Sequence, residues 1–327
     1  MRYSVFDQIE ISGEPLGQLY RDRLEMIRVL DDAGFTHYFK SEHHMIPLDS
    51  MPQIGLLFAA AAESTTSIRL GSLVYLLPFH HPIRLAEEIC SLDHLLDGRF
   101  DVGVGRGISL PEHELWGLDT TRMVENYEEA LAVLRAALTA DVLTFHGDTY
   151  HFDDLPIMLH PLQQPMPPMW HPGNFVHAAR EGMHTIVVGP PPMVAEQVAK
   201  YRAACEAAGW SGGDVGGINN VIVAPTDEEA VALARRSWPV FTEHLTPLFR
   251  KWDLAPPNDP TLGGNVELAL QVGAITAGSP TTVAERLAEF EDVAGTDLFV
   301  GKFTMGDLTH AEVMRSIDLF ASHVMRR

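Results

Sequence analysis

The stretch "IRLGSLVYLLPFHHPIRLAEEICSLDHLLDGRFDVGVG", residues 68–105, holds a strand pattern, a helix pattern and a second strand pattern in direct succession. Residues 68–78 form a long apolar run rich in branched side chains, which is typical of a strand buried on both faces. Residues 81–98 have amphipathic spacing and end at Gly98, which predicts a helix. Residues 99–105 predict the next strand. This order indicates a parallel sheet covered by helices.

The same alternation extends along nearly the whole chain of 327 residues. A helix is predicted from about Leu16 to a stop at Gly34, and another over 55–65. Thr226 and Thr309 each precede a glutamate by three residues, the spacing of a capping box. Ser279 followed by proline predicts a further helix start. The predicted strands lie at about 2–6, 35–39, 68–78, 99–105, 168–170, 184–188, 217–223 and 297–303.

Eight strands alternating with helices favour a single (β/α)8 TIM-type barrel domain spanning residues 1–327. A Rossmann-like fold with a second domain is the alternative. Two segments break the rhythm, at about 144–167 and 238–272, and we expect both to be insertions over the catalytic face. Because residues 240–272 are rich in proline and glycine, we further expect a mobile lid there.

Composition excludes several classes of function. The formal charge is −21, from 44 acidic and 23 basic residues, so nucleic acid and anionic membranes would be repelled. Apolar residues make up 46% of the chain, enough for a full core. Cys90 and Cys205 have no CxxC spacing and are expected to be free thiols of a reducing compartment. Without a signal-peptide pattern or a run of membrane length, we expect a soluble, cytoplasmic protein.

Polar motifs follow three of the predicted strands, where a barrel places its active site. They are "SEHH" (41–44), "FHHP" (79–82) and "GRG" (105–107). Neighbouring histidines on an extended chain point to opposite faces, so only one of each pair can face the site. The sequence contains no HxH or HExxH, and we predict no metal site. The glycine-flanked Arg106 can bind a phosphate, although a surface arginine at a tight turn has the same pattern.

These motifs resemble those of the bacterial-luciferase-like flavin monooxygenases. "SLDHLLDGRFDVGVGRG" (91–107) is similar to the family signature, and "SEHH", "PFHHPIRLAEE" (78–88) and "AGSPTTVAERLAEF" (277–290) fall in the same order as in alkanal-oxidising luciferase subunits. The resemblance covers residues 1–135 and 273–325 well. It implies a barrel that binds reduced FMN, forms a C4a-hydroperoxide with O₂ and oxygenates an organic substrate.

The resemblance also implies roles for individual residues. His43 is expected to be the catalytic histidine, with His44 beside it. Arg106 and Arg122 (in "DTTRM", 119–123) are expected at the flavin phosphate. The remaining cofactor-site candidates are Glu42, His81, Gly105, Gly107, Ile108, Trp170, His171, Gly173 and Asn174. Candidates for an apolar substrate wall are Phe6, Met45, Ile46, Tyr75, Leu77, Phe79 and Trp116.

The chain departs from the family pattern at "PPMWHPGNFVHAAREG" (167–182). Small hydroxyl residues are usual there, where they and a helix N-terminus take the FMN phosphate. This chain has His171, Gly173 and Asn174 instead, so the backbone amides of a helix starting near Asn174 would have to bind the anion. The reactive cysteine of the luciferase glycine turn is replaced by Gly105, and light emission is not inferred.

The resemblance implies the oxygenase component of a two-component system, in which a separate flavin reductase supplies the cofactor. The expected substrate is a small apolar molecule such as an aldehyde, a ketone or a terpenoid-like compound. Two alternatives stay open: a deazaflavin-dependent dehydrogenase that transfers hydride without O₂, and a non-catalytic flavin-storage protein. A homodimer is expected, because the alanines at 59–62 permit close helix approach and the family pairs barrels through this region.

Overall fold

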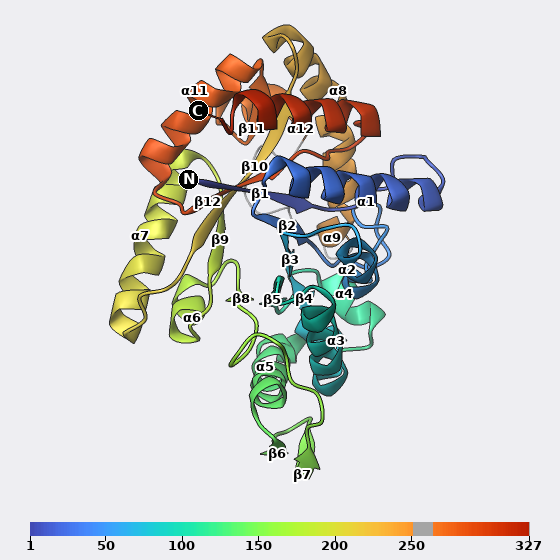
Figure 1. The fold of residues 1–327 in the computed structure, drawn as a ribbon, viewed down its shortest axis with the longest axis vertical. Helices are drawn as coiled ribbons and strands as arrows, with labels where there is room; N and C mark the ends of the chain where they lie inside the picture. Colours follow the sequence, from blue (N-terminus) through green and yellow to red (C-terminus); the bar gives the residue numbers. More distant parts are fainter. Residues whose placement is uncertain (251–263, 327) are drawn as a thin grey trace.

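The fold of the protein is known from a computed structural model, which describes residues 1–250 and 264–326. The N-terminal part alternates strands and helices, as Figure 1 shows in blue to green. Its elements are β1 (Arg2–Asp7), α1 (Leu16–Ala33), β2 (His37–Lys40), α2 (Ile54–Ala62), β3 (Arg69–Ser72), β4 (Tyr75–Leu76), η1 (Leu77–Phe79), α3 (Pro82–Leu95), β5 (Phe100–Gly105), α4 (Leu110–Leu115), η2 (Thr120–Arg122) and α5 (Met123–Thr139).

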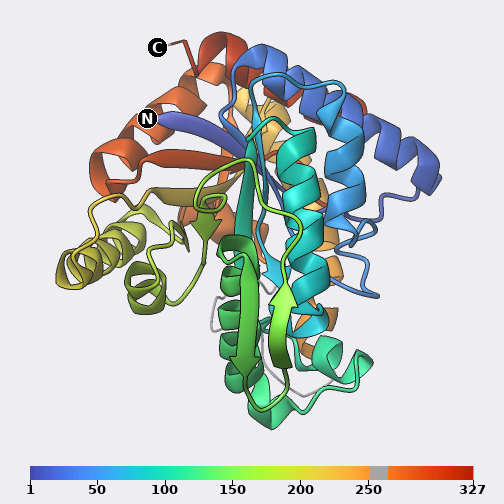
Figure 2. The same ribbon diagram turned by 60° about the horizontal axis from the view of Figure 1, so that its bottom comes forward.

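The C-terminal part begins with an antiparallel hairpin and then resumes the alternation. The hairpin projects beyond α5 at the bottom of Figure 1 and runs beside it in Figure 2. The elements are β6 (Val142–His146), β7 (His151–Pro156), β8 (Met169–Trp170), α6 (Phe175–Arg180), β9 (Thr185–Val188), α7 (Pro191–Ala208), β10 (Val215–Val223), α8 (Asp227–Leu245), α9 (Pro247–Arg250), α10 (Val266–Gln271), β11 (Ile275–Gly278), α11 (Pro280–Ala294), β12 (Leu298–Lys302) and α12 (His310–His323).

The central sheet has 10 strands and is curled, with helices on its outer side. Its main order is β11-β10-β12-β1-β2-β3-β5-β4, while β8 pairs with β5 and β9 with β10. Every pairing within this sheet is parallel. An isolated parallel bridge between Trp170 and His184 connects β8 to the residue before β9. The prediction of an α/β protein with a parallel sheet is therefore confirmed.

Local signals explain where several helices begin and end. Gly34 ends α1 with φ 86°, a left-handed conformation that favours glycine. Ser279 caps α11 by accepting a hydrogen bond from the Thr282 amide, and a proline follows it. Thr309 and Glu312 form the predicted capping box of α12. Thr226 caps α8 through the Glu229 amide.

Four sequence predictions need correction. The expected strand at 68–78 is divided into β3 and β4, because the chain bends at residues 73–74. β11 was not predicted, since "ITAG" is short and half of it is small residues. The segment 144–167 contains most of an antiparallel hairpin instead of irregular loop alone. α8 continues through Pro239 to Leu245, and α9 and α10 occupy further parts of 238–272, so these parts are not loop.

The lid prediction for residues 240–272 falls partly on 251–263, outside the described residues. Within the described residues, no helix combines the length and the hydropathy needed to cross a bilayer. The N- and C-termini lie on the same side of the molecule, next to α11 (Figure 1).

Candidate active site

A cavity of about 1370 Å³ opens beside the C-terminal ends of β2, β4, β5 and β8. This is the edge at which parallel α/β sheets bind ligands. Helices α4, α5, α6 and α7 supply its other walls. Nine of the predicted site residues line it together: Glu42, His43, Gly105, Arg106, Gly107, Ile108, His171, Gly173 and Asn174.

Glu42 is a buried carboxylate that joins the segment after β2 to the segment 76–80. Its side chain is 2% exposed and accepts hydrogen bonds from Nε2 of His44 at 2.8 Å, from Nε2 of His80 at 2.9 Å and from the Leu76 amide at 2.9 Å. Burial, the largest influence, would raise the pKa of Glu42, but the bonds from His44 and His80 outweigh it and lower the pKa to about 2. Glu42 is therefore a fixed negative charge.

The Glu42 carboxylate in turn affects the His80 ring that donates to it. Burial alone would lower the pKa of its imidazole, but the hydrogen bond and the negative charge of Glu42 raise it above the ordinary value. His80 was not predicted as a site residue. In "FHHP" the histidine that contacts Glu42 is His80, while His81 occupies the N-cap position of α3 without a side-chain capping hydrogen bond.

His43 lines the cavity with its side chain 15% exposed. Its backbone amide donates to Oδ2 of Asp49 at 3.2 Å, which fixes the chain after β2. Asp49 is itself held by Lys40 at 2.6 Å, and both side chains are fully buried. The ring atom Nδ1 of His43 is buried and has no hydrogen bond among the described residues, and Oε1 of Glu112 lies 3.5 Å from it.

The glycine turn after β5 is required by close packing. A Cβ on Gly103 would collide with the backbone oxygen of Ser72, and one on Gly105 would lie 2.5 Å from Cγ2 of Val74. Glycine at these positions lets β5 approach the bend between β3 and β4. Gly107 has φ 84°, where a side chain is strained. The turn directs Arg106 to the cavity wall, exposed and without an ion pair to any described residue.

The far end of the cavity contains a cluster of Tyr127, His171 and His177. Nδ1 of His171 donates to the Val104 carbonyl at 3.0 Å and lies 3.0 Å from the Tyr127 hydroxyl, which is 3.3 Å from Nε2 of His177. Burial, with the nearby His177 and Arg106, lowers the pKa of His171 to about 4. His171 is thus neutral at pH 7 and offers no charge to an anion.

The Asn174 side chain makes its hydrogen bond at the start of its own helix. Its side-chain oxygen accepts from the His177 amide and caps α6, which is only six residues long. The positive groups that remain at this end are Arg106, Arg180 and, further out, Lys200, which pairs with Glu196 at 2.8 Å.

Besides Glu42, five predicted residues line a second pocket of about 470 Å³ between α2 and α3: His44, Tyr75, Phe79, His81 and Trp116. The His44 ring packs edge-on against Phe79 and Trp116. Glu42 contacts both spaces. His43 and His44 therefore face different cavities, as adjacent residues of an extended chain do.

The other predicted residues lie in neither space. Leu77 is 1% exposed in the main core, and Ile46 packs against that core. Phe6 packs against the smaller core cluster, and Met45 is 86% exposed at the surface.

Two predicted cofactor contacts also have other partners. Arg122 forms a surface ion pair with Asp148 at 2.8 Å. Trp170 is 1% exposed, and its indole nitrogen donates to Asp101 at 2.8 Å inside the sheet. The positions of Arg122 and Trp170 therefore give no support to a direct role in cofactor binding.

Sequence reasoning also missed residues that line the cavity. Glu112, Tyr127, His177 and Arg180 come from helices α4, α5 and α6. One signal was present: "SLPE" (109–112) has capping-box spacing, and Ser109 does cap α4 through the Glu112 amide. The others stand on amphipathic helices where nothing in the pattern separates a cavity-facing polar residue from an exposed one.

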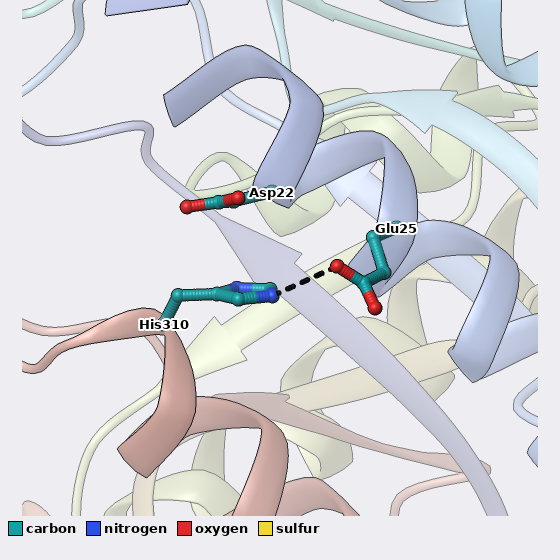
Figure 3. A group of neighbouring side chains, drawn as sticks. All are labelled: Asp22, Glu25 and His310. Atoms are coloured by element: carbon teal, nitrogen blue, oxygen red, sulfur yellow. Dashed lines mark hydrogen bonds and ion pairs between the residues drawn. The ribbon is translucent and has the colours of Figure 1, made fainter. Parts of the chain in front are cut away.

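Among the described residues, one group of side chains could hold a metal ion: Asp22 and Glu25 on α1 with His310 on α12 (Figure 3). Their ligand atoms lie within 4.8 Å of one another. Nε2 of His310 already contacts Oε2 of Glu25 at 3.2 Å, and Gln18 donates to Asp22 at 2.6 Å. The group lines neither cavity and acts as a polar contact between the two helices.

Comparison with other sequences identifies the family. Residues 1–297 match the family described as luciferase-like monooxygenase. An uncharacterized protein of Sinorhizobium fredii is 31% identical, over 94% of this chain and 92% of its own length. The oxygenase component of a flavin-dependent trigonelline monooxygenase of Acinetobacter baylyi is 30% identical, over 63% of this chain and 60% of its own.

Solved structures share the fold. The oxygenating constituent of 3,6-diketocamphane monooxygenase from Pseudomonas putida, in complex with FMN, superposes with a TM-score of 0.85 at 20% identity, covering 100% of this chain and 98% of its own. An F420-dependent secondary alcohol dehydrogenase has a TM-score of 0.76 at 19% identity, covering 99% of each chain. With the family match over residues 1–297, the chain belongs to the luciferase-like monooxygenases.

Proposed function

We propose that this protein is the oxygenase component of a two-component, FMNH₂-dependent monooxygenase acting on a small apolar organic molecule. The observation that carries the proposal is the joint placement of His43, the glycine turn and Arg106, which has no ion pair among the described residues, on one large cavity at the C-terminal edge of the sheet. The relatives include a flavin-dependent monooxygenase, and one structural neighbour is a monooxygenase in complex with FMN.

The residues present fit reduced FMN. The cavity, at about 1370 Å³, exceeds the roughly 300–1,000 Å³ of typical ligand sites, which leaves room for cofactor and substrate together. Its wall combines apolar surface with few positive groups, as a flavin ring and a phosphate require. Leu73, Val74 and Ile108 would contact the ring, and Arg106 with Arg180 would hold the phosphate. Since His171 is neutral, these two arginines bear most of the charge at that end.

When bound, reduced FMN supplies the two electrons with which O₂ is activated, so that one oxygen atom enters the substrate and the other leaves as water. His43 stands on the cavity wall and exchanges a proton with the reacting groups. Val74 and Leu76 line the space beside it and exclude water from the reaction. Glu42 and His80, which form a hydrogen bond behind this wall, hold the segment 41–44 in place.

Three further features belong to the proposal. We propose that a separate reductase supplies the flavin, as the name of the trigonelline enzyme's oxygenase component suggests for that relative. The curled sheet would be a closed (β/α)8 barrel, which the bridge between Trp170 and His184 supports. A homodimer would form through α2, where Leu56 is 67% exposed beside the alanine run, and sedimentation at micromolar concentration would test it.

Anaerobic titration tests the proposal. The protein should bind FMNH₂ more tightly than a reduced deazaflavin, and mixing the complex with ¹⁸O₂ and a panel of apolar ketones, aldehydes and terpenes should place one labelled atom in a product. His43→Ala should bind flavin nearly normally and lose turnover. Preferential binding of the deazaflavin, with hydride transfer and no use of O₂, would show instead a dehydrogenase. Flavin binding without any turnover on the panel would favour a storage protein.

A further inference from the structure

We propose that Glu112 is a positioning residue, which holds the ring proton of His43 on Nδ1 and so presents Nε2 without a proton to the cavity. The catalytic meaning of this arrangement rests on the proposed function. The arrangement itself is a property of the protein without its cofactor.

Among the described residues, one polar group, the Glu112 carboxylate, lies close to Nδ1 of His43. This atom is buried and has no hydrogen bond among the described residues, and Oε1 of Glu112 stands 3.5 Å away. A buried ring nitrogen without a partner is costly, and such atoms in native proteins call for an explanation. Catalytic hydrogen bonds in ligand-free sites are often long or poorly aligned and tighten when the ligand is bound. We take this 3.5 Å approach as the contact that supplies Nδ1 with its acceptor.

The Glu112 carboxylate is held in place by a second contact. Its Oε1 accepts a hydrogen bond from the His44 amide at 2.7 Å, and the side chain is 3% exposed. In a capping box the glutamate three residues after the N-cap returns to the N-cap amide. Here Ser109 caps the Glu112 amide in the usual way, but the carboxylate contacts the segment after β2 instead. One oxygen thus fixes both the backbone of His44 and the ring of His43.

The chemistry follows from the nature of the two groups. An ionised carboxylate only accepts hydrogen bonds, so the ring nitrogen that faces Glu112 must carry the proton. In a neutral imidazole the other nitrogen is then an acceptor, and the hydrogen bond at one nitrogen decides which tautomer is present. His43 would therefore take a proton at Nε2, and the carboxylate would stabilise the cation that results. Asp49, the other nearby carboxylate, contacts only the backbone amide of His43.

Nuclear magnetic resonance of the flavin-free protein tests the tautomer directly. With ¹⁵N-labelled histidine, long-range ¹H–¹⁵N spectra at about pH 8.5, where most imidazoles are neutral, separate protonated from unprotonated ring nitrogens. Signals missing from the His43→Ala spectrum belong to His43. In the wild-type protein the proton should be on Nδ1. A His43 ring protonated on Nε2 would overturn the proposal.

Two variants give independent outcomes. Glu112→Met removes the acceptor and should move the proton to Nε2 or give a mixture. Glu112→Gln keeps an oxygen that the His44 amide holds toward the ring, so the proton should stay on Nδ1 while the Nδ1 resonance shifts with the loss of charge. Spectra of His43 unchanged in both variants would refute the contact. If Glu112→Met does not fold, the isosteric Glu112→Gln still decides. Glu125→Gln, an exposed carboxylate at the start of α5, is the matched control and should leave the His43 signals unchanged.

Turnover supplies the second readout. In Glu112→Met, kcat should fall by about 10²-fold, the lower end of what a positioned acid–base group contributes, while the KM and the affinity for FMNH₂ stay near wild type. A loss confined to flavin affinity would contradict positioning of His43. Should the protein fail to oxygenate any substrate, the spectra still test the placement of the proton, so failure of the proposed function and failure of this inference are distinguishable.

Discussion

Glu42→Gln should destabilise the protein in a strongly pH-dependent manner. The structure gives the size of the effect. The pKa of Glu42 is lowered from 4.5 to about 2 although burial opposes the shift, because His44 and His80 donate to the carboxylate. A shift of about 2.5 units corresponds to roughly 3 kcal/mol of folding free energy at neutral pH, since each unit is about 1.4 kcal/mol. This is an upper value, because glutamine still accepts a hydrogen bond.

The sign of the pH dependence follows from the direction of the shift. A carboxyl whose pKa is lower in the folded state contributes stability above its unfolded pKa and loses that stability as the pH falls toward the folded pKa. The difference in unfolding free energy between wild type and Glu42→Gln should therefore be constant above about pH 5.5 and smaller by about 1.4 kcal/mol near pH 3.5. His80, whose pKa is raised, adds stability at low pH that declines as the pH rises, so the difference should weaken slightly above neutrality.

Urea unfolding at several pH values measures these differences, with Glu87→Gln on the exposed side of α3 as a control for the change of charge. Equal stability of wild type and Glu42→Gln at pH 7 would refute the reasoning. A difference that grows as the pH falls would do so as well, because it would mean that the carboxylate is not the stabilising form.

Three other changes have defined outcomes. Arg106→Ala should weaken FMNH₂ binding by about 1.5–3 kcal/mol, or roughly 10–150-fold, in an anaerobic titration, whereas Arg28→Ala, on the surface of α1, should not; equal affinities would remove Arg106 from the phosphate site. Met45→Gly should stabilise the protein by up to about 1 kcal/mol in urea, because Met45 has φ 56° and is 86% exposed; a lower midpoint would show that its backbone is not strained. Gly105→Ala should cost about 1–3 kcal/mol, since its Cβ would lie 2.5 Å from Val74, while Gly17→Ala in α1 meets only Arg21 at 3.6 Å and should be tolerated.

Local signals predicted the elements whose reasons are local. The caps at Ser279 and Thr309 and the stop at Gly34 depend on a few adjacent residues, so the sequence alone was sufficient to place α11, α12 and the end of α1. β11 was not predicted, because four residues, two of them small, are too few to show the alternation of apolar and polar side chains that marks a strand. Its place is fixed by hydrogen bonds to β10, which lies 55 residues earlier at the paired positions Asn220 and Ile275.

Tertiary packing also overrides a local signal in α8. Pro239 should end a helix, yet the helix continues because Trp238 and Phe241 on either side of it are buried at 2% and 7% exposure. The bend at residues 73–74 has a similar origin. Branched apolar residues predict one strand over 68–78, but the chain there contacts Gly103 and Gly105 of β5, and only their lack of side chains permits that approach. The glycines were visible in the sequence as a turn motif, while their partner on the neighbouring strand was not.

The two adjacent histidines show which features of the site could be predicted from the sequence. Alternation along an extended chain requires His43 and His44 to face opposite ways, and they do line different cavities. What alternation cannot supply is the identity of the groups that meet them. Glu42, two residues before His44 in the chain, accepts a hydrogen bond from the His44 ring. Glu112, on α4 and 69 residues after His43, lies next to the His43 ring. The Glu42 carboxylate holds His44 and His80, which line the smaller pocket. The Glu112 carboxylate faces His43, which lines the larger cavity. A cluster of three titratable groups after a strand is thus physically consistent, because the two adjacent imidazoles, His43 and His44, meet different carboxylates.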